Sequence, residues 1–268
     1  MHEQQIKLNG KNIFFRLTGK GPAVVLLHGF GEDGTIWEDQ YRSINGFQFL
    51  VPDLPGTGRS ELISDMSMEG LATCIRELTT HLDIEKFILT GHSMGGYVSL
   101  AFAEKFPEKI VGLGLFHSTA YADTEEKKST RRKGIGFIRK NGAFEFLKTS
   151  IPNLYAPATR EHHPQMVEDQ IRASHNFSDA ALVLYYESMI QRPSRVNILK
   201  NSHAPVLFVL GRYDAAVPLK DGLEQCYLAP LTYIHVLENS GHMGMKEETG
   251  EANSILSNYL NSLHHQTQ

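Results

Sequence analysis

Polar and apolar positions along this chain follow two spacings in turn, one typical of strands and one typical of helices. Residues 5–8 and 12–17 have the composition of short strands, and the Asn9-Gly10 pair between them is a strong two-residue hairpin signal. Residues 23–27 form a continuous apolar run of the kind found in strands buried on both faces. We therefore expect an antiparallel hairpin followed by a central parallel strand.

Strand-like and helix-like segments alternate through most of the remaining chain. The further expected strands are residues 47–51, 87–90, 110–116, 206–210 and 233–237, and the expected helices are residues 35–44, 69–82, 97–105 and 247–263. Alternation of this kind predicts an α/β fold with a mostly parallel sheet of eight strands and helices on both faces.

One long stretch departs from the alternation. Residues 119–202 contain no run resembling a buried strand, and their charged and aromatic positions are interleaved as in helices. We expect this stretch to be a helical cap, or lid, inserted into an α/β core made of residues 1–118 and 203–268. Its charge-dense start, residues 125–133, predicts a solvated helix face, because acidic residues there stand beside basic ones.

Composition excludes several classes of function. With 41% hydrophobic and 21% charged residues, the chain is neither disordered nor fibrous in character. A net charge of -4 gives no general attraction to nucleic acid or anionic lipid. No apolar run reaches the roughly 20 residues of a membrane helix, and residues 1–9 lack the features of a secretory signal. We expect a soluble, cytoplasmic protein, with Cys74 and Cys226 as free thiols.

Residues 91–95 read Gly-His-Ser-Met-Gly and join an expected strand to an expected helix. A serine flanked by glycines at such a turn can hold the strained backbone that exposes its hydroxyl, an arrangement called a nucleophile elbow. The five-residue pattern also arises by chance in flexible turns, so its context carries the interpretation. Ser93 is the candidate nucleophile.

A serine hydroxyl needs a base within hydrogen-bond reach and a group that orients the base. His242 lies in a glycine-flanked loop directly after the last expected strand, and Asp214 lies in the turn after residues 206–210. Carboxyl ends of parallel strands meet at one edge of a sheet, where such folds gather their active sites. Taken alone, His242 would be a surface loop residue and Asp214 the start of a helix.

These motifs together resemble the α/β-hydrolase superfamily, in particular its compact capped branch of small-molecule esterases, carbon–carbon bond hydrolases and lyases. Two more motifs share the resemblance: His-Gly-Phe at residues 28–30, and Asp-Leu-Pro-Gly-Thr-Gly-Arg-Ser at residues 53–60. The resemblance covers nearly the whole chain. It includes the order of the candidate residues along the chain, which is serine, acid and then histidine.

The resemblance implies site residues. Ser93, Asp214 and His242 would form a catalytic triad, and the backbone N–H groups of Phe30 and Met94 would form the oxyanion hole. His28 would support its loop, and residues 53–60 would be a structural turn beside the site. Neither a cofactor nor a metal ion is expected, and the expected partner is a small-molecule substrate, with no nucleic acid and no membrane; the oligomeric state is left open.

Three functions fit this pattern. Hydrolysis of a small carboxylic ester through an acyl-enzyme comes first, and cleavage or elimination on a dicarbonyl-type metabolite is the alternative. Menaquinone-type lyases have an arginine at the position of Tyr97, so its absence here weakens the lyase form of the alternative. Arg59, Arg192 and Arg212 could take the place of that arginine, but such residues are more often surface charges. A ligand-sensing protein with the same fold is the third. Serine at the elbow argues against epoxide and halide chemistry, for which relatives carry aspartate.

Overall fold

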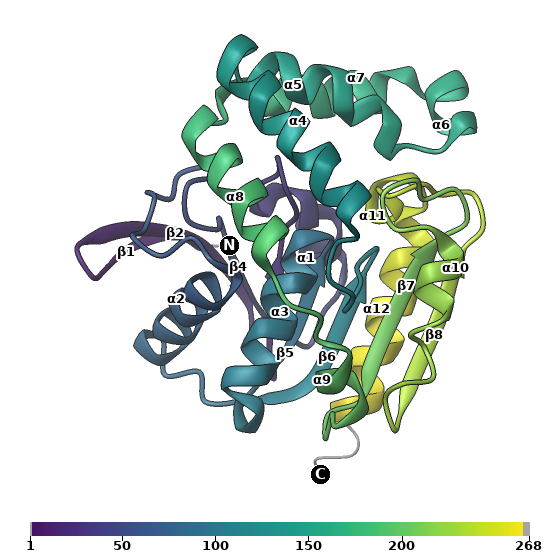
Figure 1. The fold of residues 1–268 in the computed structure, drawn as a ribbon. Helices are drawn as coiled ribbons and strands as arrows, with labels where there is room; N and C mark the ends of the chain where they lie inside the picture. Colours follow the sequence, from purple (N-terminus) through teal and green to yellow (C-terminus); the bar gives the residue numbers. More distant parts are fainter. Residues whose placement is uncertain (1, 265–268) are drawn as a thin grey trace.

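The computed structural model describes residues 2–264 and is built on one eight-stranded sheet (Figure 1). The strands are β1 (His2–Leu8), β2 (Lys11–Gly19), β3 (Ala23–Leu27), β4 (Gln48–Pro52), β5 (Phe87–His92), β6 (Ile110–Phe116), β7 (Val206–Gly211) and β8 (Thr232–Leu237). They lie in the order β1-β2-β4-β3-β5-β6-β7-β8, and only the pairs that involve β2 are antiparallel. The predicted fold class is confirmed.

The first hairpin turns where the sequence predicts it. Asn9 and Gly10 have φ of 48° and 82°, the left-handed values that a two-residue hairpin turn requires. Strand β1 is longer than expected and begins at His2, which pairs with Leu17. Its first residues are exposed and polar at the sheet edge, so they show no apolar pattern from which a strand could be recognised.

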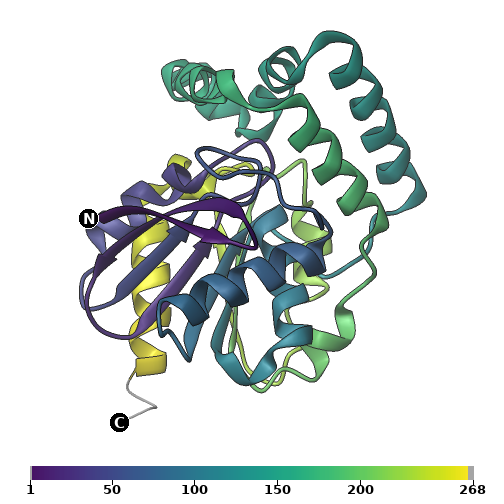
Figure 2. The ribbon, with the colours of Figure 1, turned by 90° about the vertical axis from the view of Figure 1, so that its left-hand side faces the viewer.

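Helices cover both faces of the sheet (Figure 2). Those of the core are α1 (Glu38–Ser43), α2 (Met68–His81), α3 (Met94–Lys105), α10 (Leu219–Leu223), α11 (Gly244–Glu247) and α12 (Thr249–His264), with a 3-10 turn, η1 (Gly34–Trp37), before α1. Helices α2 and α3 pack together on one face, and α1 packs with α12 on the other. The sheet is thereby buried between two helical layers.

Helix α3 begins at Met94, three residues before its expected start at Tyr97. Gly95 and Gly96 are poor helix formers and hid this first turn from the apolar pattern. Gly95 is needed there because a Cβ at this position would lie 2.4 Å from the carbonyl oxygen of Leu27 in β3. The start of α3 is thus pressed against the neighbouring strand.

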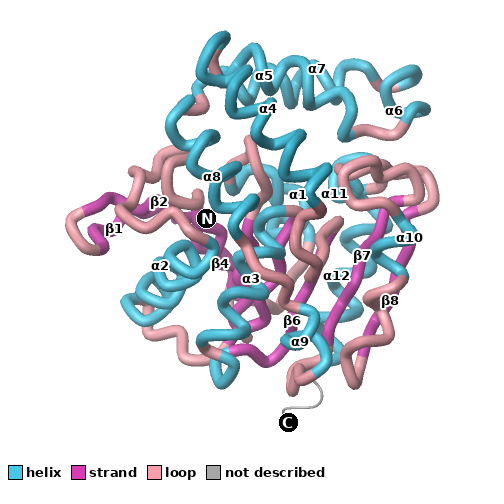
Figure 3. Tube along the Cα trace, viewed as in Figure 1, coloured by secondary structure: helices cyan, strands magenta, loops and turns pink. Residues whose placement is uncertain are grey.

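Most of the segment between β6 and β7 lies above the sheet in the view of Figures 1 and 3. It contains α4 (Glu125–Asn141), α5 (Ala143–Ser150), η3 (Ile151–Leu154), α6 (Pro157–His162), α7 (Pro164–Ala173), η4 (Ser174–Asn176), α8 (Asp179–Gln191) and α9 (Val196–Lys200), with no strand among its residues. We refer to α4 through α8 as the cap helices. Helix α9 packs instead against α3 of the core.

Specific polar contacts hold the cap helices to the core. The Tyr185 hydroxyl of α8 donates to the carbonyl of Pro55 (2.6 Å), and the Glu247 carboxylate of α11 accepts from the Thr159 hydroxyl of α6 (2.7 Å).

Within residues 2–264, no helix is long and apolar enough to span a membrane.

Residues 53–60 form a turn built around one buried carboxylate. Asp53 accepts from Arg16 Nη1 (2.6 Å) and Gly34 N (3.0 Å) on Oδ1, and from Arg59 N (3.0 Å) on Oδ2. The Arg16 and Asp53 side chains are only 7% and 1% exposed, so each is the counter-charge of the other in the protein interior. This pair fixes the turn against β2.

Replacing Arg16 is therefore expected to destabilise the chain. The Arg16→Met variant leaves the buried charge of Asp53 without its partner, which costs about 3 kcal/mol of unfolding free energy. Arg42→Met removes an arginine whose pair with Glu38 is exposed, and should cost less than about 1 kcal/mol. Urea unfolding measures both, and equal losses in the two variants would contradict the structural role of Arg16.

Candidate active site

Ser93 lies between β5 and α3 in a strained backbone conformation. Its φ and ψ are 49° and -114°, a region that non-glycine residues rarely adopt. The flanking glycines permit the sharp turn, since a Cβ on Gly91 would lie 2.2 Å from the backbone of Gly95. The Ser93 N–H donates to the carbonyl of Phe116 in β6 (2.9 Å), which fixes the turn to the sheet. The serine is held at the carboxyl edge of the central strands.

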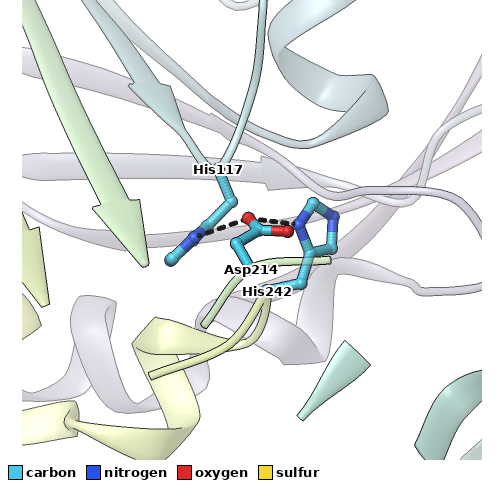
Figure 4. A group of neighbouring side chains, drawn as sticks. All are labelled: His117, Asp214 and His242. Atoms are coloured by element: carbon cyan, nitrogen blue, oxygen red, sulfur yellow. Dashed lines mark hydrogen bonds and ion pairs between the residues drawn. The ribbon is translucent and has the colours of Figure 1, made fainter. Parts of the chain in front are cut away.

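His242 and Asp214 meet although they come from different loops (Figure 4). Asp214 follows β7 and His242 follows β8, and His242 Nδ1 lies 2.8 Å from Asp214 Oδ2. Both residues are buried, and the backbone N–H of His242 donates to the Leu154 carbonyl of η3 (2.6 Å). His242 and Ser93 line the same cavity, but no hydrogen bond joins these two side chains in the ligand-free chain. Such bonds commonly tighten only when substrate is bound.

Four donors surround the Asp214 carboxylate. Oδ1 accepts from the backbone N–H groups of Ala216 and Val217 (both 2.8 Å), and Oδ2 accepts from His242 and from His117 Nδ1 (3.2 Å). Burial alone would favour the neutral acid. The attraction of His242 and the hydrogen bonds from both histidines outweigh it and hold the Asp214 pKa well below its usual range. Asp214 is therefore a charged acceptor at neutral pH.

His117 was not singled out from the sequence. It follows β6 directly, so the rule that pointed to Asp214, a polar residue at the carboxyl end of a parallel strand, could have found it. It is fully buried with φ of 48°, and burial, only partly offset by the bond to Asp214, lowers its pKa to about 4. His117 is thus neutral near pH 7 and donates its Nδ1 proton to Asp214.

The same three residues form the one metal-type cluster among residues 2–264. Nitrogen and oxygen atoms of His117, Asp214 and His242 lie within 4.8 Å of one another. Both Nδ1 atoms already lie within hydrogen-bond distance of one carboxylate oxygen, so donors and acceptor are matched without an ion. Their arrangement suits orientation of His242 better than metal ligation.

Two free backbone donors lie close to Ser93. Met94 is the first residue of α3, so its N–H belongs to the unpaired end of a helix. Phe30 lies in the loop after β3 and lines the cavity that contains Ser93. Neither amide donates a hydrogen bond within the described chain. Free N–H groups at such positions suit an oxygen that gains negative charge.

Behind Phe30, the buried His28 ring ties two loops together. It receives the Leu54 N–H at Nε2 (2.9 Å) and the Thr57 hydroxyl lies 3.0 Å from the same atom, while Nδ1 donates to the carbonyl of Gly29 (2.8 Å). All its polar contacts are to residues of these loops, which suits a supporting residue. Residues 53–60 are thereby placed against the loop that carries Phe30.

The cavity over Ser93 is small and mostly apolar. Its volume is about 140 Å³, and its apolar wall comes from both the cap helices and the core. The lining residues that give it this character are Phe30, Leu147, Ile151, Leu154, Tyr186, Met189 and Val217. A second cavity, of about 610 Å³, adjoins it and shares Glu32 and Gln170. Only a small group fits the cavity beside Ser93.

Two arginines of the cap differ from the sequence-based expectation. The sequence predicts a solvated helix face for Arg131 and a surface charge for Arg192, but Arg131 lines the cavity and Arg192 is 5% exposed. Both bind one carboxylate, with Arg131 Nε 2.6 Å from Asp123 Oδ2 and Arg192 Nη2 2.9 Å from Asp123 Oδ1. Tertiary packing joined charges that the local pattern could not relate. The cluster carries one excess positive charge beside the cavity.

Comparison with known proteins agrees with this geometry. The model of the α/β hydrolase fold family matches residues 22–134. A thermophilic esterase from Thermogutta terrifontis, solved with malate bound, superposes with a TM-score of 0.92 at 28% identity, covering 98% of this chain and 100% of that one.

Curated relatives include enzymes and one protein without an assigned activity. A 2-hydroxy-6-oxo-6-phenylhexa-2,4-dienoate hydrolase from Comamonas testosteroni is 26% identical over 278 aligned positions, covering 92% of this chain and 91% of the relative. An uncharacterized protein of Mycobacterium tuberculosis is 37% identical over 105 residues, but the match spans only 31% of that protein.

The fold suggested by the sequence motifs is thus confirmed by three kinds of observation: the family model, the whole-chain superposition and the sheet topology. The chain has the α/β-hydrolase fold, and the family model and the hydrolases that it resembles share that fold.

Proposed function

We propose that this chain is a serine hydrolase that cleaves a small carboxylic ester through an acyl-enzyme, with Ser93 as nucleophile. One observation carries the proposal: Ser93, on a strained elbow, shares a cavity with His242, whose ring is oriented by a buried, ionised Asp214. The similarity to the Thermogutta esterase supports the same chemistry.

In the first half of the reaction, His242 Nε2 accepts the Ser93 hydroxyl proton while Oγ attacks the ester carbonyl carbon. Negative charge moves onto the carbonyl oxygen, which the N–H groups of Phe30 and Met94 stabilise. His242 then donates its proton to the departing alkoxide, and the alcohol leaves. Asp214 remains ionised and stabilises the transient imidazolium.

In the second half, water takes the place of the alcohol. His242 accepts a proton from the water as its oxygen attacks the acyl carbon, and the same backbone N–H groups stabilise the charge again. Collapse of this intermediate returns the proton to Ser93 Oγ and releases a carboxylic acid. Every proton is carried by His242, so the cycle restores the starting state.

A second candidate, hydrolysis of a carbon–carbon bond in a carboxylate-bearing dicarbonyl compound, is favoured by Arg131. This residue gives the cavity wall a guanidinium, and its Nη1 makes no hydrogen bond with any described residue. The relative from Comamonas is named for a dienoate, an anionic substrate. Both reactions use the same serine, and a carboxylate bound by Arg131 would suit either one.

The first prediction concerns the nucleophile. Ser93→Ala removes the attacking oxygen and should lower kcat on p-nitrophenyl acetate at least about 1000-fold, as when one member of a coupled triad is lost. Ser99→Ala, which deletes a buried hydroxyl of the same helix, is the control and should keep wild-type turnover. Equal turnover by Ser93→Ala and wild type rejects Ser93 as nucleophile. If a fluorophosphonate probe fails to label the folded wild-type chain, a ligand-sensing role is favoured instead.

The second prediction concerns substrate charge. Arg131→Met should lower kcat/KM for ethyl hydrogen succinate about tenfold or more, and change that for neutral ethyl pentanoate less than about threefold, because only the anion loses a charge-assisted hydrogen bond. Arg132→Met alters the adjacent, exposed arginine and should change neither. Equal losses on the anionic and the neutral ester would show that Arg131 has no role in recognising charge.

The third prediction concerns His117 and pH. Its folded pKa of about 4 lies below the ordinary value of 6.5, so the unfolded chain binds more protons between these values and stability falls as the pH is lowered. Between about pH 7 and about pH 5 this one histidine should account for about 2 kcal/mol of lost stability.

The test is urea unfolding of His117→Asn at both pH values. Asparagine tolerates the left-handed backbone at this position and can still donate to Asp214, but it does not titrate. The variant should lose about 2 kcal/mol less than wild type on acidification. The same pH dependence in both proteins would contradict the assignment of a buried neutral His117.

A further inference from the structure

A second carboxylate and histidine lie buried behind the catalytic residues. Glu32 follows the loop that carries Phe30, and His92 directly precedes Ser93; their exposed fractions are 4% and 0%. Glu32 Oε2 accepts the Gly29 N–H (2.6 Å) and lies 2.9 Å from His92 Nδ1. His92 Nε2 lies 2.9 Å from the backbone carbonyl of His242. The contacts join three loops, each of which carries one part of the proposed chemistry.

The hydrogen-bond roles of these atoms restrict where protons lie. The carbonyl oxygen of His242 can only accept, so His92 Nε2 must carry a proton. An ionised Glu32 Oε2 accepts from both Gly29 N–H and His92 Nδ1, which then carries a proton too, and the short bond from Gly29 N–H favours this ionised form. In this form both ring nitrogens are protonated, so His92 is an imidazolium and Glu32 is its counter-charge.

We infer that Glu32 and His92 form a buried carboxylate–imidazolium pair that positions the loops of Phe30, Ser93 and His242. The functional consequence of the inference rests on the proposed serine mechanism, whereas the charge of the pair is argued from its own contacts and surroundings. Both are positioning residues, because they act through the backbone of Gly29 and His242.

The surroundings of the pair agree with this charge state. Burial alone would lower the pKa of His92 and raise that of Glu32, but their mutual attraction and hydrogen bond outweigh it and shift both pKa values the other way. The other titratable groups around them are His28 and Tyr155, which face Glu32, and Asp214, His117 and His242, which surround His92. The negative charge of Asp214 also favours the imidazolium.

The pair fits tightly against the oxyanion loop. A Cβ on Gly29 would lie 2.9 Å from Glu32 Oε2 and 3.0 Å from His92 Nδ1, so the backbone of Gly29 rests directly on the paired atoms. Gly29 precedes Phe30, whose N–H is the proposed oxyanion donor. A displacement of about 1 Å at such a donor can cost roughly a factor of 100 in rate. Loss of the pair should therefore lower kcat more than it raises KM.

Glu32→Gln tests the pair because only one atom, Oε2, serves both partners. An amide oxygen at that place leaves the imidazolium without a counter-charge, and an amide nitrogen opposes the Gly29 N–H. We expect kcat on p-nitrophenyl acetate to fall about 10- to 100-fold while KM changes less than about threefold. Asp33→Asn, which changes the neighbouring acid to an equally good helix cap, is the control and should stay within about twofold of wild type.

NMR of ¹⁵N-histidine-labelled protein supplies a readout that does not depend on activity. The signals of His92 are identified by their loss in His92→Gln. In wild type they should show both ring nitrogens protonated near neutral pH. In Glu32→Gln they should show a neutral ring. As the pH rises and this histidine loses its Nδ1 proton, wild-type kcat should fall in parallel. That comparison needs only wild-type kinetics if Glu32→Gln does not fold.

A neutral His92 in wild type, or a Glu32→Gln variant that is as active as Asp33→Asn, would overturn the inference. Failure of the serine mechanism is a separate result: activity would then survive in Ser93→Ala, and NMR would still report the protonation state of His92 independently.

Discussion

Strand β5 passes into helix α3 through one residue, Ser93, whose left-handed backbone is held by the sheet on one side and by flanking glycines on the other. The turn is possible only because Gly91 and Gly95 have no side chains, and it is kept in place by the bond from Ser93 N–H to β6. Because the strain is local and the sheet is rigid, the hydroxyl has little freedom to relax away from the cavity. The roles proposed for Met94, His242 and the cap all depend on where this turn places the Ser93 hydroxyl.

The site and the turn beside it contain buried carboxylates. Each of them has a counter-charge or several hydrogen-bond donors within hydrogen-bond distance. Asp53 pairs with Arg16, Asp214 is surrounded by four donors, and Glu32 faces His92. Burying an unpaired carboxylate would cost several kcal/mol, so these pairs fix loops that would otherwise be free to move. The loops around Ser93 are thereby preorganised before substrate binds, which is what electrostatic stabilisation of a transition state requires.

The cap helices add what the core lacks, a wall for the substrate. They supply most of the apolar lining of the small cavity and its one guanidinium, Arg131. In the proposed reaction the core places the reacting groups, while the cap limits the size and charge of the acyl group that reaches them. This division agrees with a superfamily in which one scaffold serves many reactions.

Local patterns in the sequence determined the strands, the hairpin at Asn9-Gly10 and the elbow, because each depends on residues close together in the chain. The same patterns, with the rule that parallel strands end at one edge, singled out Asp214 and His242. Contacts between distant residues were decided only by the tertiary structure. His117 and Glu32 acquire their roles from partners 97 and 60 positions away, and Arg131 turns toward the cavity because Asp123 and Arg192 meet it there. The spacing of apolar residues shows which face of a helix is buried. It does not show which charged residue, distant in the chain, packs against that helix.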